Sequence, residues 1–550
     1  MMDHIFTITI NEKELKFAKK VKLIDLIDGD VHDYIAALVN NKLRELNYEV
    51  FYDAKVELLT QKDYDAIRIY ETSLRYIVAM ACSRVFPRAT TKYSYSISRS
   101  IFLTFTKDAP CLDSKSLKLL DNEIKNIINQ DYPLIRTVVP NEEAKEIYLK
   151  KGFDDKIEIL KYRPEKTVHL YSCAEYMNYM YGHMVPSTGH IKDYSLRIYD
   201  NGIIIQYPRS EEKGKIPEFQ DAPTFGRVLK ESYEWGKLVR TSTVSQINNW
   251  ASKENQMDFI TMCEAHHNNM LAELGIKILS DISNIRMICI AGPSSSGKTT
   301  FANRLRVELM SRGLSPIRIS IDDYYLEKKF IPKDENGQPD LECIEALNID
   351  QFNQDMLDLI NGEEVTLPHF DFKIGKQVPG KTLKLGKNEI LIIEGIHALN
   401  DRLTSLVARH QKFKIFIAPQ AQVNIDNHNP ISLTDLRLLR RIVRDYKFRG
   451  SSAEETMSMW ASVRKGEFKW IYSTQEDADY VFNSLLPYEL CVMRRYALPL
   501  LRAIDKESDY GPLAERLIKF LKFFIDMDDK WVPCNSIIRE FIGDSCFQDV

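Results

Sequence analysis

An eight-residue stretch, Gly-Pro-Ser-Ser-Ser-Gly-Lys-Thr at positions 292–299, constrains the fold of this 550-residue chain more than any other feature. Five apolar residues at 287–291 precede it and predict a short, buried, parallel strand. Beyond it, Phe301, Leu305 and Leu309 recur at helical spacing. In such a strand–loop–helix context, successive backbone N–H groups and the helix N-terminus can surround phosphate oxygens. The sequence therefore predicts a phosphate-binding loop (P-loop).

The residue types in this loop fit distinct tasks in holding a nucleotide. Gly292 and Gly297 let the backbone turn so that its amides face inward. Lys298 is expected to reach the β and γ phosphates, and Thr299 to offer its hydroxyl to magnesium. We expect the nucleotide to be bound by the whole run of Gly292, Pro293, Ser294, Ser295, Ser296, Gly297, Lys298, Thr299 and Thr300. The loop does not by itself identify the molecule that receives the phosphate.

The amino-acid composition narrows the classes of molecule that the chain is expected to bind. Hydrophobic residues make up 44% and charged residues 28% of the chain, and the formal net charge is −4 with a pI near 6.3. This balance gives no overall attraction to nucleic acid or an anionic membrane. No apolar run approaches the ~20 residues that span a bilayer, and the start resembles neither a signal nor a transit peptide. Nine singly scattered cysteines suggest neither a zinc site nor a disulfide framework, and they fit a reducing cytoplasm.

The first 62 residues show short alternating segments. Residues 5–10 alternate, a turn follows, and the alternation resumes at 15–17, which predicts a β-hairpin. We expect a helix across 35–38 and further short strands at 43–46 and 56–59. Centred on Ala-Ala-Leu-Val-Asn-Asn-Lys-Leu at 36–43, this order of elements resembles the TGS domain, a small β-grasp module at the front of threonyl-tRNA synthetases. The resemblance implies a β-grasp domain over residues 1–62.

Residues 63–235 continue the same resemblance. The segments 69–73 and 84–87 resemble the helix that opens the synthetase's second additional domain, and Val-Pro-Ser-Thr-Gly-His-Ile-Lys at 185–192 resembles a later part of it. The resemblance implies an α+β domain here. RNA binding by this front half is one alternative that it raises.

The editing site of that synthetase domain is not retained in this sequence. The family has three histidines and a cysteine where this chain has Thr72, Tyr76, Met180 and Met184, none of which suits a general base or a hard-metal ligand. We therefore expect a scaffold without editing activity. His183, one residue from an expected position, is interpreted as an ordinary loop or core histidine.

Residues 236–284 have helical periodicity and predict a connector to the next domain. They contain a His266–His267 pair, and adjacent helical residues point about 100° apart, so this pair is a poor metal clamp. We assign both histidines to the surface.

Acidic residues stand at the ends of two further predicted strands. Residues 317–321 form an apolar strand followed by Asp322 and Asp323. In an open α/β sheet, ligands collect beyond the carboxyl ends of the strands, so Asp322 is placed to accept a proton from an attacking hydroxyl. A capping or structural role is expected for Asp323. Glu394, directly after a strand at 390–393, occupies the place of an acid that holds magnesium or its water.

Additional apolar strands are predicted at 413–417 and 480–482. Strands with intervening helices make a doubly wound parallel sheet. The expected architecture is thus an α/β P-loop kinase domain preceded by a small β-grasp domain and an α+β domain.

Five motifs resemble uridine-cytidine kinase, in order and at similar spacing. They are the P-loop, Ser-Ile-Asp-Asp-Tyr-Tyr at 320–325, Phe-Asp-Phe at 370–372, Ile-Glu-Gly-Ile at 393–396 and the arginine-rich run at 440–450. The resemblance covers residues 285 to about 500. We expect a uridine-kinase-like domain over 285–505 and a C-terminal helical cap over 506–550.

This second resemblance implies site roles and cofactors. Lys298 and Asp322 would be catalytic, with Asp322 as base, while Arg444 and Arg449 would be lid arginines over the phosphates. Thr299 and Glu394 would serve Mg²⁺, and ATP would be the donor. The acceptor would lie near Tyr325, Phe370, Phe372 and Arg441. Arg440 is assigned to a solvated basic face.

The acceptor motifs depart from the family pattern. Phe370 replaces a tyrosine, Gly375 replaces a histidine, and the family's sugar-binding acidic motif is matched only loosely by Asp340 or Glu342. The leading hypothesis is an ATP- and Mg²⁺-dependent kinase of a nucleoside 5′-hydroxyl. Two alternatives stay open: an RNA- or translation-linked ATP-binding regulator, and a kinase of another hydroxyl substrate such as a sugar phosphate. The oligomeric state stays open as well.

Overall fold

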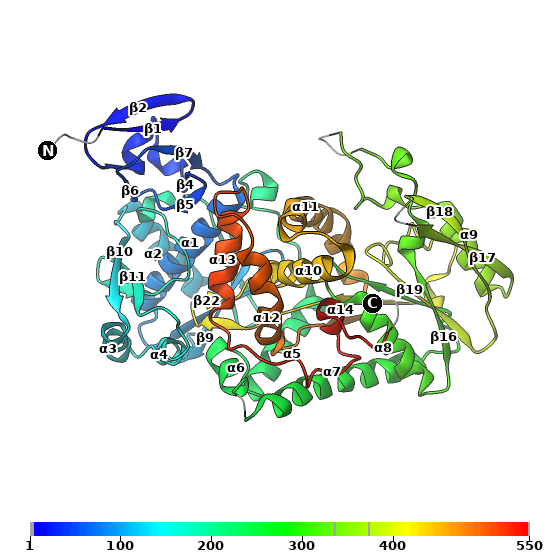
Figure 1. The fold of residues 1–550 in the computed structure, drawn as a ribbon. Helices are drawn as coiled ribbons and strands as arrows, with labels where there is room; N and C mark the ends of the chain where they lie inside the picture. Colours follow the sequence, from blue (N-terminus) through cyan, green and yellow to red (C-terminus); the bar gives the residue numbers. More distant parts are fainter. Residues whose placement is uncertain (1–4, 253, 334–336, 372–373, 548–550) are drawn as a thin grey trace.

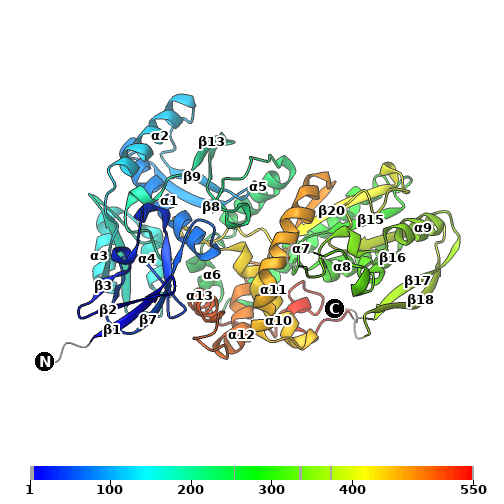
Figure 2. The same ribbon diagram turned by 90° about the horizontal axis from the view of Figure 1, so that it is seen from above.

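The structure is a computed structural model that describes residues 5–252, 254–333, 337–371 and 374–547 (Figure 1). The front half of the chain lies on one side, a parallel sheet with its hairpin lies on the other, and helices α10 to α13 lie between them (Figures 1 and 2). No helix in the described ranges combines the length and the apolar character needed to cross a bilayer.

A five-stranded mixed sheet of order β2-β1-β7-β4-β5 begins the chain. Its strands are β1 (Phe6–Ile10), β2 (Lys13–Phe17), β4 (Ala36–Val39), β5 (Lys42–Arg44) and β7 (Ala54–Leu59). The predicted hairpin is confirmed as β1 and β2. The predicted helix at 35–38 is wrong. These residues form β4 because their backbone pairs with β5 on one side and β7 on the other, which outweighs the local preference of alanine for helix.

The next region is built around one long helix. Helix α1 (Tyr64–Val85) shares its apolar core with an antiparallel sheet of order β13-β14-β9-β8. These strands are β8 (Thr90–Tyr95), β9 (Ile101–Lys107), β13 (Ser195–Tyr199) and β14 (Gly202–Gln206). A second sheet and three helices complete the region: β10 (Ile135–Pro140), β11 (Thr167–Cys173), β12 (Tyr176–Asn178), α2 (Ser114–Asn129), α3 (Asn141–Lys151) and α4 (Asp154–Leu160).

Three helices lead into a parallel sheet of order β16-β19-β15-β20-β23. The helices are α5 (Pro223–Leu238), α6 (Val244–Trp250) and α7 (Gln256–Leu279). The strands are β15 (Met287–Ala291), β16 (Ser315–Ser320), β19 (Glu389–Glu394), β20 (Lys412–Ala418) and β23 (Tyr480–Asn483). Every pair in this sheet is parallel, which confirms the predicted fold class.

Both faces of this sheet are covered, as a doubly wound sheet requires. Ile288 and Ile290 of β15 share a core with α7, α8 (Lys298–Met310) and α10 (Leu433–Arg449). Met287 and Cys289 point the other way, toward α9 (Ile349–Ile360) and Val228 of α5. Side chains on a strand alternate between faces, so one five-residue apolar run serves two cores.

Several further elements complete the second half. A hairpin, β17 (Glu364–Asp371) and β18 (Lys376–Lys384), projects beside α9. The remaining helices are α11 (Ala453–Gly466), α12 (Glu489–Arg502), α13 (Gly511–Leu521) and α14 (Arg539–Ile542). A capping box between Ser452 and Glu455 starts α11.

A small hairpin inserts from the second half into the first. It consists of β21 (Asn424–Asp426) and β22 (Asn429–Pro430), directly before α10. Asp426 forms a fully buried ion pair with Lys156 of α4 at 2.9 Å. The Asn424 side-chain amide donates to the backbone carbonyl of Tyr93 at 2.7 Å. The two halves are therefore interlocked rather than joined by a linker.

Candidate active site

The P-loop leaves β15 and enters α8 through a left-handed Gly297, whose φ is +91°. A Cβ on Gly292 would lie 2.0 Å from the carbonyl oxygen of Ile417, so only glycine fits there. The buried hydroxyls of Ser295, Ser296 and Thr300 have no hydrogen-bond partner among the described residues. Unpartnered polar atoms beside a helix N-terminus fit a phosphate ligand.

Arginines of α10 hold this loop from behind. Arg437 donates to the Ser294 carbonyl oxygen at 3.0 and 2.8 Å, and Arg441 donates to the Ser294 hydroxyl at 2.9 Å. Glu467 accepts from the Ser294 N–H at 3.0 Å and also pairs with Arg437. The backbone of Ser294 is thus held through both of its polar groups, the carbonyl oxygen by Arg437 and the N–H by Glu467.

The assignment of Arg440 to a solvated face is wrong. Its side chain is 1% exposed and forms two bonds to Glu489, at 2.9 and 2.6 Å. It also reaches the Ser295 carbonyl oxygen at 3.3 Å. Helical spacing distinguishes faces of a helix but does not say which face is buried. The packing of α10 between the P-loop and α12 decides that.

Lys298 points back along the loop in this structure. Its ammonium donates to the carbonyl oxygens of Gly292 at 3.0 Å and Pro293 at 3.2 Å. Burial lowers the pKa of Lys298, opposed chiefly by the negative charge of Glu394.

The two residues expected to serve magnesium lie together. The Thr299 hydroxyl donates to Glu394 at 3.3 Å, and Arg318 donates to the same carboxylate oxygen at 3.3 Å. Burial, followed by repulsion from Asp322, raises the pKa of Glu394 to about 7. A hydroxyl and a carboxylate are the oxygen ligands that suit Mg²⁺, so these residues fit that ion.

Asp322 lies just past β16, in a short 3₁₀ turn capped by Ser320. Solvent reaches its side chain, yet the surrounding protein desolvates the carboxyl enough to raise its pKa. Lys298 and Arg449 oppose that rise, which puts Asp322 within electrostatic reach of both. Asp323 has a structural role instead: it accepts from the Phe370 N–H at 3.2 Å and pairs with His369 at 2.9 Å.

The predicted lid arginines converge on one aspartate that sequence reasoning left without a role. Asp445 is 1% exposed and contacts Arg444 at 2.7 Å, Arg441 at 3.2 Å and Arg449 at 3.6 Å. A buried carboxylate that orients three guanidinium groups is a positioning residue. The sequence feature that could have identified Asp445 is its place in the arginine-rich run, one position after Arg444.

Tyr325, one of the residues expected near the acceptor, lies within electrostatic reach of Asp322. The Tyr325 ring is 6.1 Å from the Phe370 ring, and its hydroxyl donates to the Leu341 carbonyl oxygen at 3.1 Å. Phe372 lies outside the described residues. Of the two acidic alternatives, Glu342 is in electrostatic contact with Arg441 and Lys298, and burial raises its pKa to about 7. Asp340 instead accepts from the Glu342 N–H at 3.1 Å.

The C-terminal segment packs on the P-loop, which the sequence did not reveal. Glu540 of α14 accepts from the Thr300 N–H at 3.0 Å. The Ile537 side chain lies 2.5 Å from where a Cβ on Gly297 would stand. Thr300 belongs to the run that is expected to bind the nucleotide. The backbone N–H that Thr300 would offer to a phosphate oxygen is therefore already bonded to the Glu540 carboxylate.

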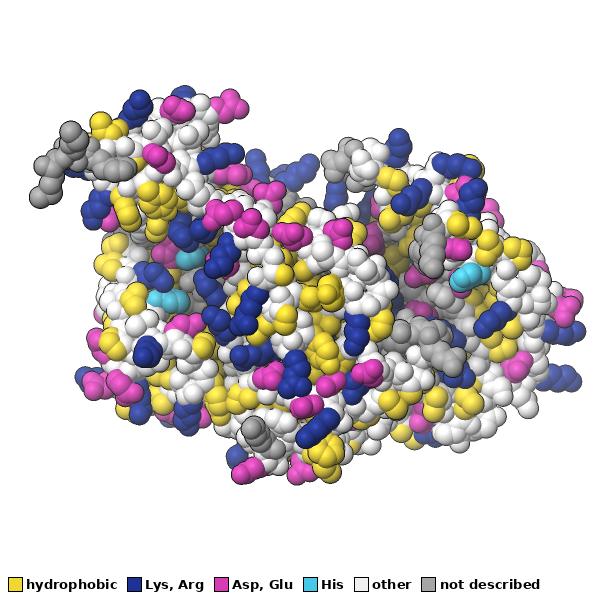
Figure 3. Space-filling view, viewed as in Figure 1, with side chains coloured by type: hydrophobic (Ala, Val, Ile, Leu, Met, Phe, Trp, Pro, Cys, Tyr) yellow, Lys and Arg dark blue, Asp and Glu magenta, His cyan; other side chains and the backbone are white. Residues whose placement is uncertain are grey.

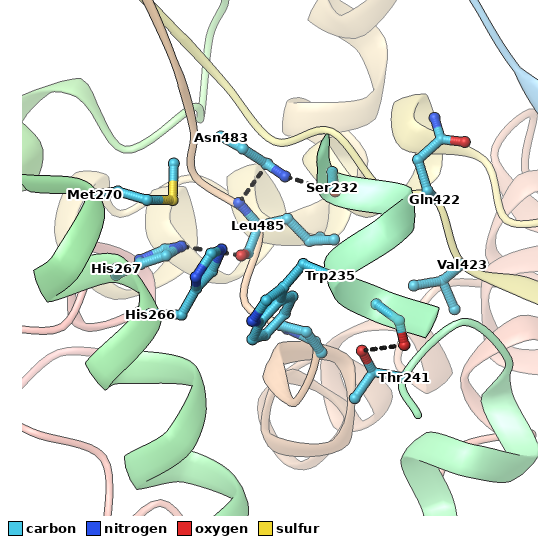
Figure 4. A pocket seen from close by; sticks show the side chains of 12 residues that line it. Ser232, Trp235, Thr241, His266, His267, Met270, Gln422, Val423, Asn483 and Leu485 are labelled. Atoms are coloured by element: carbon cyan, nitrogen blue, oxygen red, sulfur yellow. Dashed lines mark hydrogen bonds between the residues drawn. The ribbon is translucent and has the colours of Figure 1, made fainter. Parts of the chain in front are cut away.

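The structure also tests the prediction that His266 and His267 lie on the surface. His267 is not on the surface: it is 1% exposed and its Nε2 lies 3.0 Å from the Leu485 carbonyl oxygen. His266 stacks on Trp235 with ring centroids 4.1 Å apart. Both line a cavity of about 20 Å³, room for about one water (Figure 4).

The degenerate editing position is filled by packed side chains. Tyr76, Met180 and Met184 are at most 1% exposed, and the Tyr76 hydroxyl donates to the carbonyl oxygens of Tyr171 and Tyr176. His183 is not without a partner, since its Nδ1 lies 3.5 Å from a Glu45 oxygen.

Comparison with known proteins finds two kinds of relative. Residues 287–489 match the model of the Phosphoribulokinase / Uridine kinase family. The front region is similar to threonine–tRNA ligases. It is 31% identical over 189 residues to that of Desulforamulus reducens, covering 34% of this chain and 29% of the ligase. It is 28% identical over 212 residues to that of Clostridium kluyveri, covering 38% and 32%. The chain thus spans less than a third of the length of these relatives.

Among solved structures, one titled "Structure of a Possible Uridine Kinase from Bacillus stearothermophilus" is 18% identical. The alignment covers 39% of this chain and 98% of that one, with a TM-score of 0.28.

Proposed function

We propose that this chain is a kinase that transfers the γ-phosphoryl group of ATP to the 5′-hydroxyl of a nucleoside. The family match over residues 287–489 supports the coarser part, transfer from ATP to a small hydroxyl compound. The observation that carries the proposal is the convergence of a P-loop lysine, an acid just past β16, and an arginine cluster around Asp445.

Asp322 is the general base in this proposal. Desolvation raises its pKa, which makes its carboxylate a better proton acceptor. It takes the proton of the acceptor hydroxyl as the phosphoryl group moves to the oxygen. Such positioned proton transfer contributes about 10²–10⁴-fold in rate.

The P-loop and the arginines hold the phosphates. On nucleotide binding, Lys298 exchanges the carbonyl oxygens of Gly292 and Pro293 for phosphate oxygens. Arg444 and Arg449 place permanent positive charge over the transferred group, with Asp445 orienting them. Thr299 and Glu394 would hold Mg²⁺, which supplies neutralisation of phosphate charge.

The acceptor side favours a planar group. Tyr325 and Phe370 offer an aromatic edge-to-face pair, with Glu342 and Arg441 as polar neighbours. Aromatic rings suit the face of a nucleobase, and an acid suits ribose hydroxyls. The replacement of the family tyrosine by Phe370 removes one polar contact to a base, so we expect weak discrimination between bases.

An acceptor screen tests the proposal. The full chain is incubated with ATP and Mg²⁺, alone and with uridine, cytidine, adenosine, guanosine or a sugar phosphate, and ADP and phosphorylated product are measured. We expect a nucleoside monophosphate in proportion to ADP. If only a sugar phosphate is phosphorylated, the nucleoside claim is wrong but the kinase claim holds. ATP turnover that needs no acceptor, with salt-sensitive tRNA binding, would favour the regulator instead.

A further inference from the structure

Two histidines and an aspartate from three separate segments meet where the first sheet domain contacts the next region. His32 belongs to η2 (Val31–Asp33), Asp131 follows α2, and His190 belongs to η3 (Thr188–His190). One potential ligand atom from each lies within 4.8 Å of the others. The rings of His32 and His190 are 4.7 Å apart. Figure 3 shows, in cyan, the histidine side chains that reach the surface on the face of the molecule seen in Figure 1.

His190 is the residue that points to a ligand. Its side chain is 1% exposed, and its Nε2 is buried without a hydrogen-bond partner. Its Nδ1 lies 3.0 Å from the Ser187 hydroxyl oxygen. Burial lowers the pKa of His190 to about 4, so the ring is neutral at pH 7 and one nitrogen carries a lone pair.

The contact with Ser187 indicates which nitrogen that is. If Nδ1–H donates to the Ser187 hydroxyl oxygen, the lone pair of His190 is on Nε2, the buried atom without a partner.

Both ring nitrogens of His32 also lie close to oxygen atoms. Its Nδ1 lies 3.0 Å from Asp30 and its Nε2 lies 3.2 Å from Asp131. If Nδ1–H donates to Asp30, a lone pair on Nε2 faces a carboxylate oxygen, and two acceptors repel. Either a second proton on His32 or a cation between the groups removes the conflict. Only a cation also supplies a partner for His190 Nε2.

We propose that His32, Asp131 and His190 form a binding site for a divalent transition-metal ion of the zinc class, with water completing the coordination. Two imidazoles and one carboxylate are ligands that suit zinc, and three protein ligands with an open position are a known arrangement. With the metal ion on one nitrogen of each ring, the other N–H would donate to Asp30 in His32 and to Ser187 in His190, as metal-bound histidines commonly do.

The backbone around the site is shaped for close approach. The Gly189 N–H donates to Asp131 at 2.9 Å. A Cβ on Gly189 would lie 2.4 Å from an Asp131 oxygen and 3.1 Å from His32 Nε2. A side chain there would displace two of the three ligands. Because His32 comes from the first domain and the other two from the second region, a bound ion would fix their relative position.

The experiment measures metal binding by the full chain. The protein is stripped with a chelator and titrated with Zn²⁺ by calorimetry and with Co²⁺ by visible absorption, for wild type, His32→Gln and Asp131→Asn. His183→Gln is the matched control, since His183 also pairs with a carboxylate, Glu45, but belongs to no cluster of three potential metal ligands among the described residues. Exposed Cys534 and Cys546 are a competing site, which a near-ultraviolet thiolate-to-Co²⁺ band would reveal.

We expect one Zn²⁺ per wild-type or His183→Gln chain and at least about 10-fold weaker binding in both site variants. Zn²⁺ should raise the Tm of wild type but not of His32→Gln. Equal binding by wild type and His32→Gln, or a Co²⁺ spectrum with thiolate bands only, would overturn the proposal. So would the absence of Zn²⁺ binding.

Discussion

Asp322 gains its proposed role from its position past β16, where protein surrounds the carboxyl and Lys298 and Arg449 face it. The adjacent Asp323 has the same side chain but is engaged by the β17 hairpin. Sequence alone distinguished these two residues by the family motif, and hydrogen bonding in the structure assigns Asp323 to the hairpin.

Replacing Asp322 by Asn is expected to lower kcat by about 10²–10⁴-fold while ATP binding is retained. In the wild type, activity should fall as the pH falls through the pKa of Asp322, which is raised above its ordinary value near 3.8, because the base becomes protonated. The variant should lack this acidic limb. The pH profile of kcat/KM and ATP calorimetry measure both effects.

Stability provides an independent readout for the same variant. A carboxyl with a raised folded-state pKa stabilises the folded state only at low pH, and that contribution is lost as the pH rises through the folded pKa. Asp322→Asn should therefore unfold at a higher temperature than wild type at pH 8. Lower activity combined with a lower Tm would indicate general damage instead.

Arg440 carries a stability prediction. Replacing it by Met leaves Glu489 buried without its partner, and loss of one member of a buried ion pair costs about 3–5 kcal/mol. The matched control is Arg409→Met, which breaks the more exposed pair with Asp479 and should cost less than about 1 kcal/mol. Urea unfolding measures both. Equal effects would contradict the burial-based argument.

Helix α14 shows how a distant segment enters the site. The fold brings residues near the C-terminus against the first turn of α8, where Glu540 occupies the Thr300 amide. The sequence predicted packed helices in this tail but not their partner, because no local pattern encodes which surface a helix covers.

Replacing Glu540 by Gln should strengthen ATP binding. The carboxylate competes with phosphate for an amide and repels its charge, and a hydrogen bond to a charged group contributes about 1.5–3 kcal/mol, so about 10-fold tighter binding is expected. Calorimetric titration with ATP measures this, with Glu515→Gln on α13 as the control. Unchanged or weaker ATP binding in Glu540→Gln would show that the carboxylate does not compete with the nucleotide.

The whole chain behaves as one interlocked unit in this structure. Helix α7, which the sequence assigned to a connector, packs in the same core as β15 and α8 through Phe259, Ile260, Leu271, Leu274 and Ile278. The inserted hairpin places Asp426 against Lys156 in the front half. Neither contact follows from sequence spacing, because each joins segments that are separate along the chain and meet only in the folded structure.

A fragment of residues 285–550 is therefore expected not to fold stably by itself. Burial of the five α7 side chains contributes about 8–15 kcal/mol, which is comparable to the entire stability of a domain. Asp426 would also lose its buried cation. Circular dichroism and size-exclusion chromatography test the fragment, and coexpression with residues 5–284 should restore a soluble complex. A cooperatively unfolding monomeric fragment would contradict this prediction.

The sequence by itself determined the features that local chain geometry encodes. The apolar run before residues 292–299, its loop and its helix follow from side-chain period and glycine placement, and the parallel sheet follows from repeating that unit. Only the tertiary structure decided which helix faces are buried, as at Arg440, and which remote groups meet, as at Glu540 and at His32, Asp131 and His190. Those choices depend on long-range packing and charge burial, which involve residues that no local window contains.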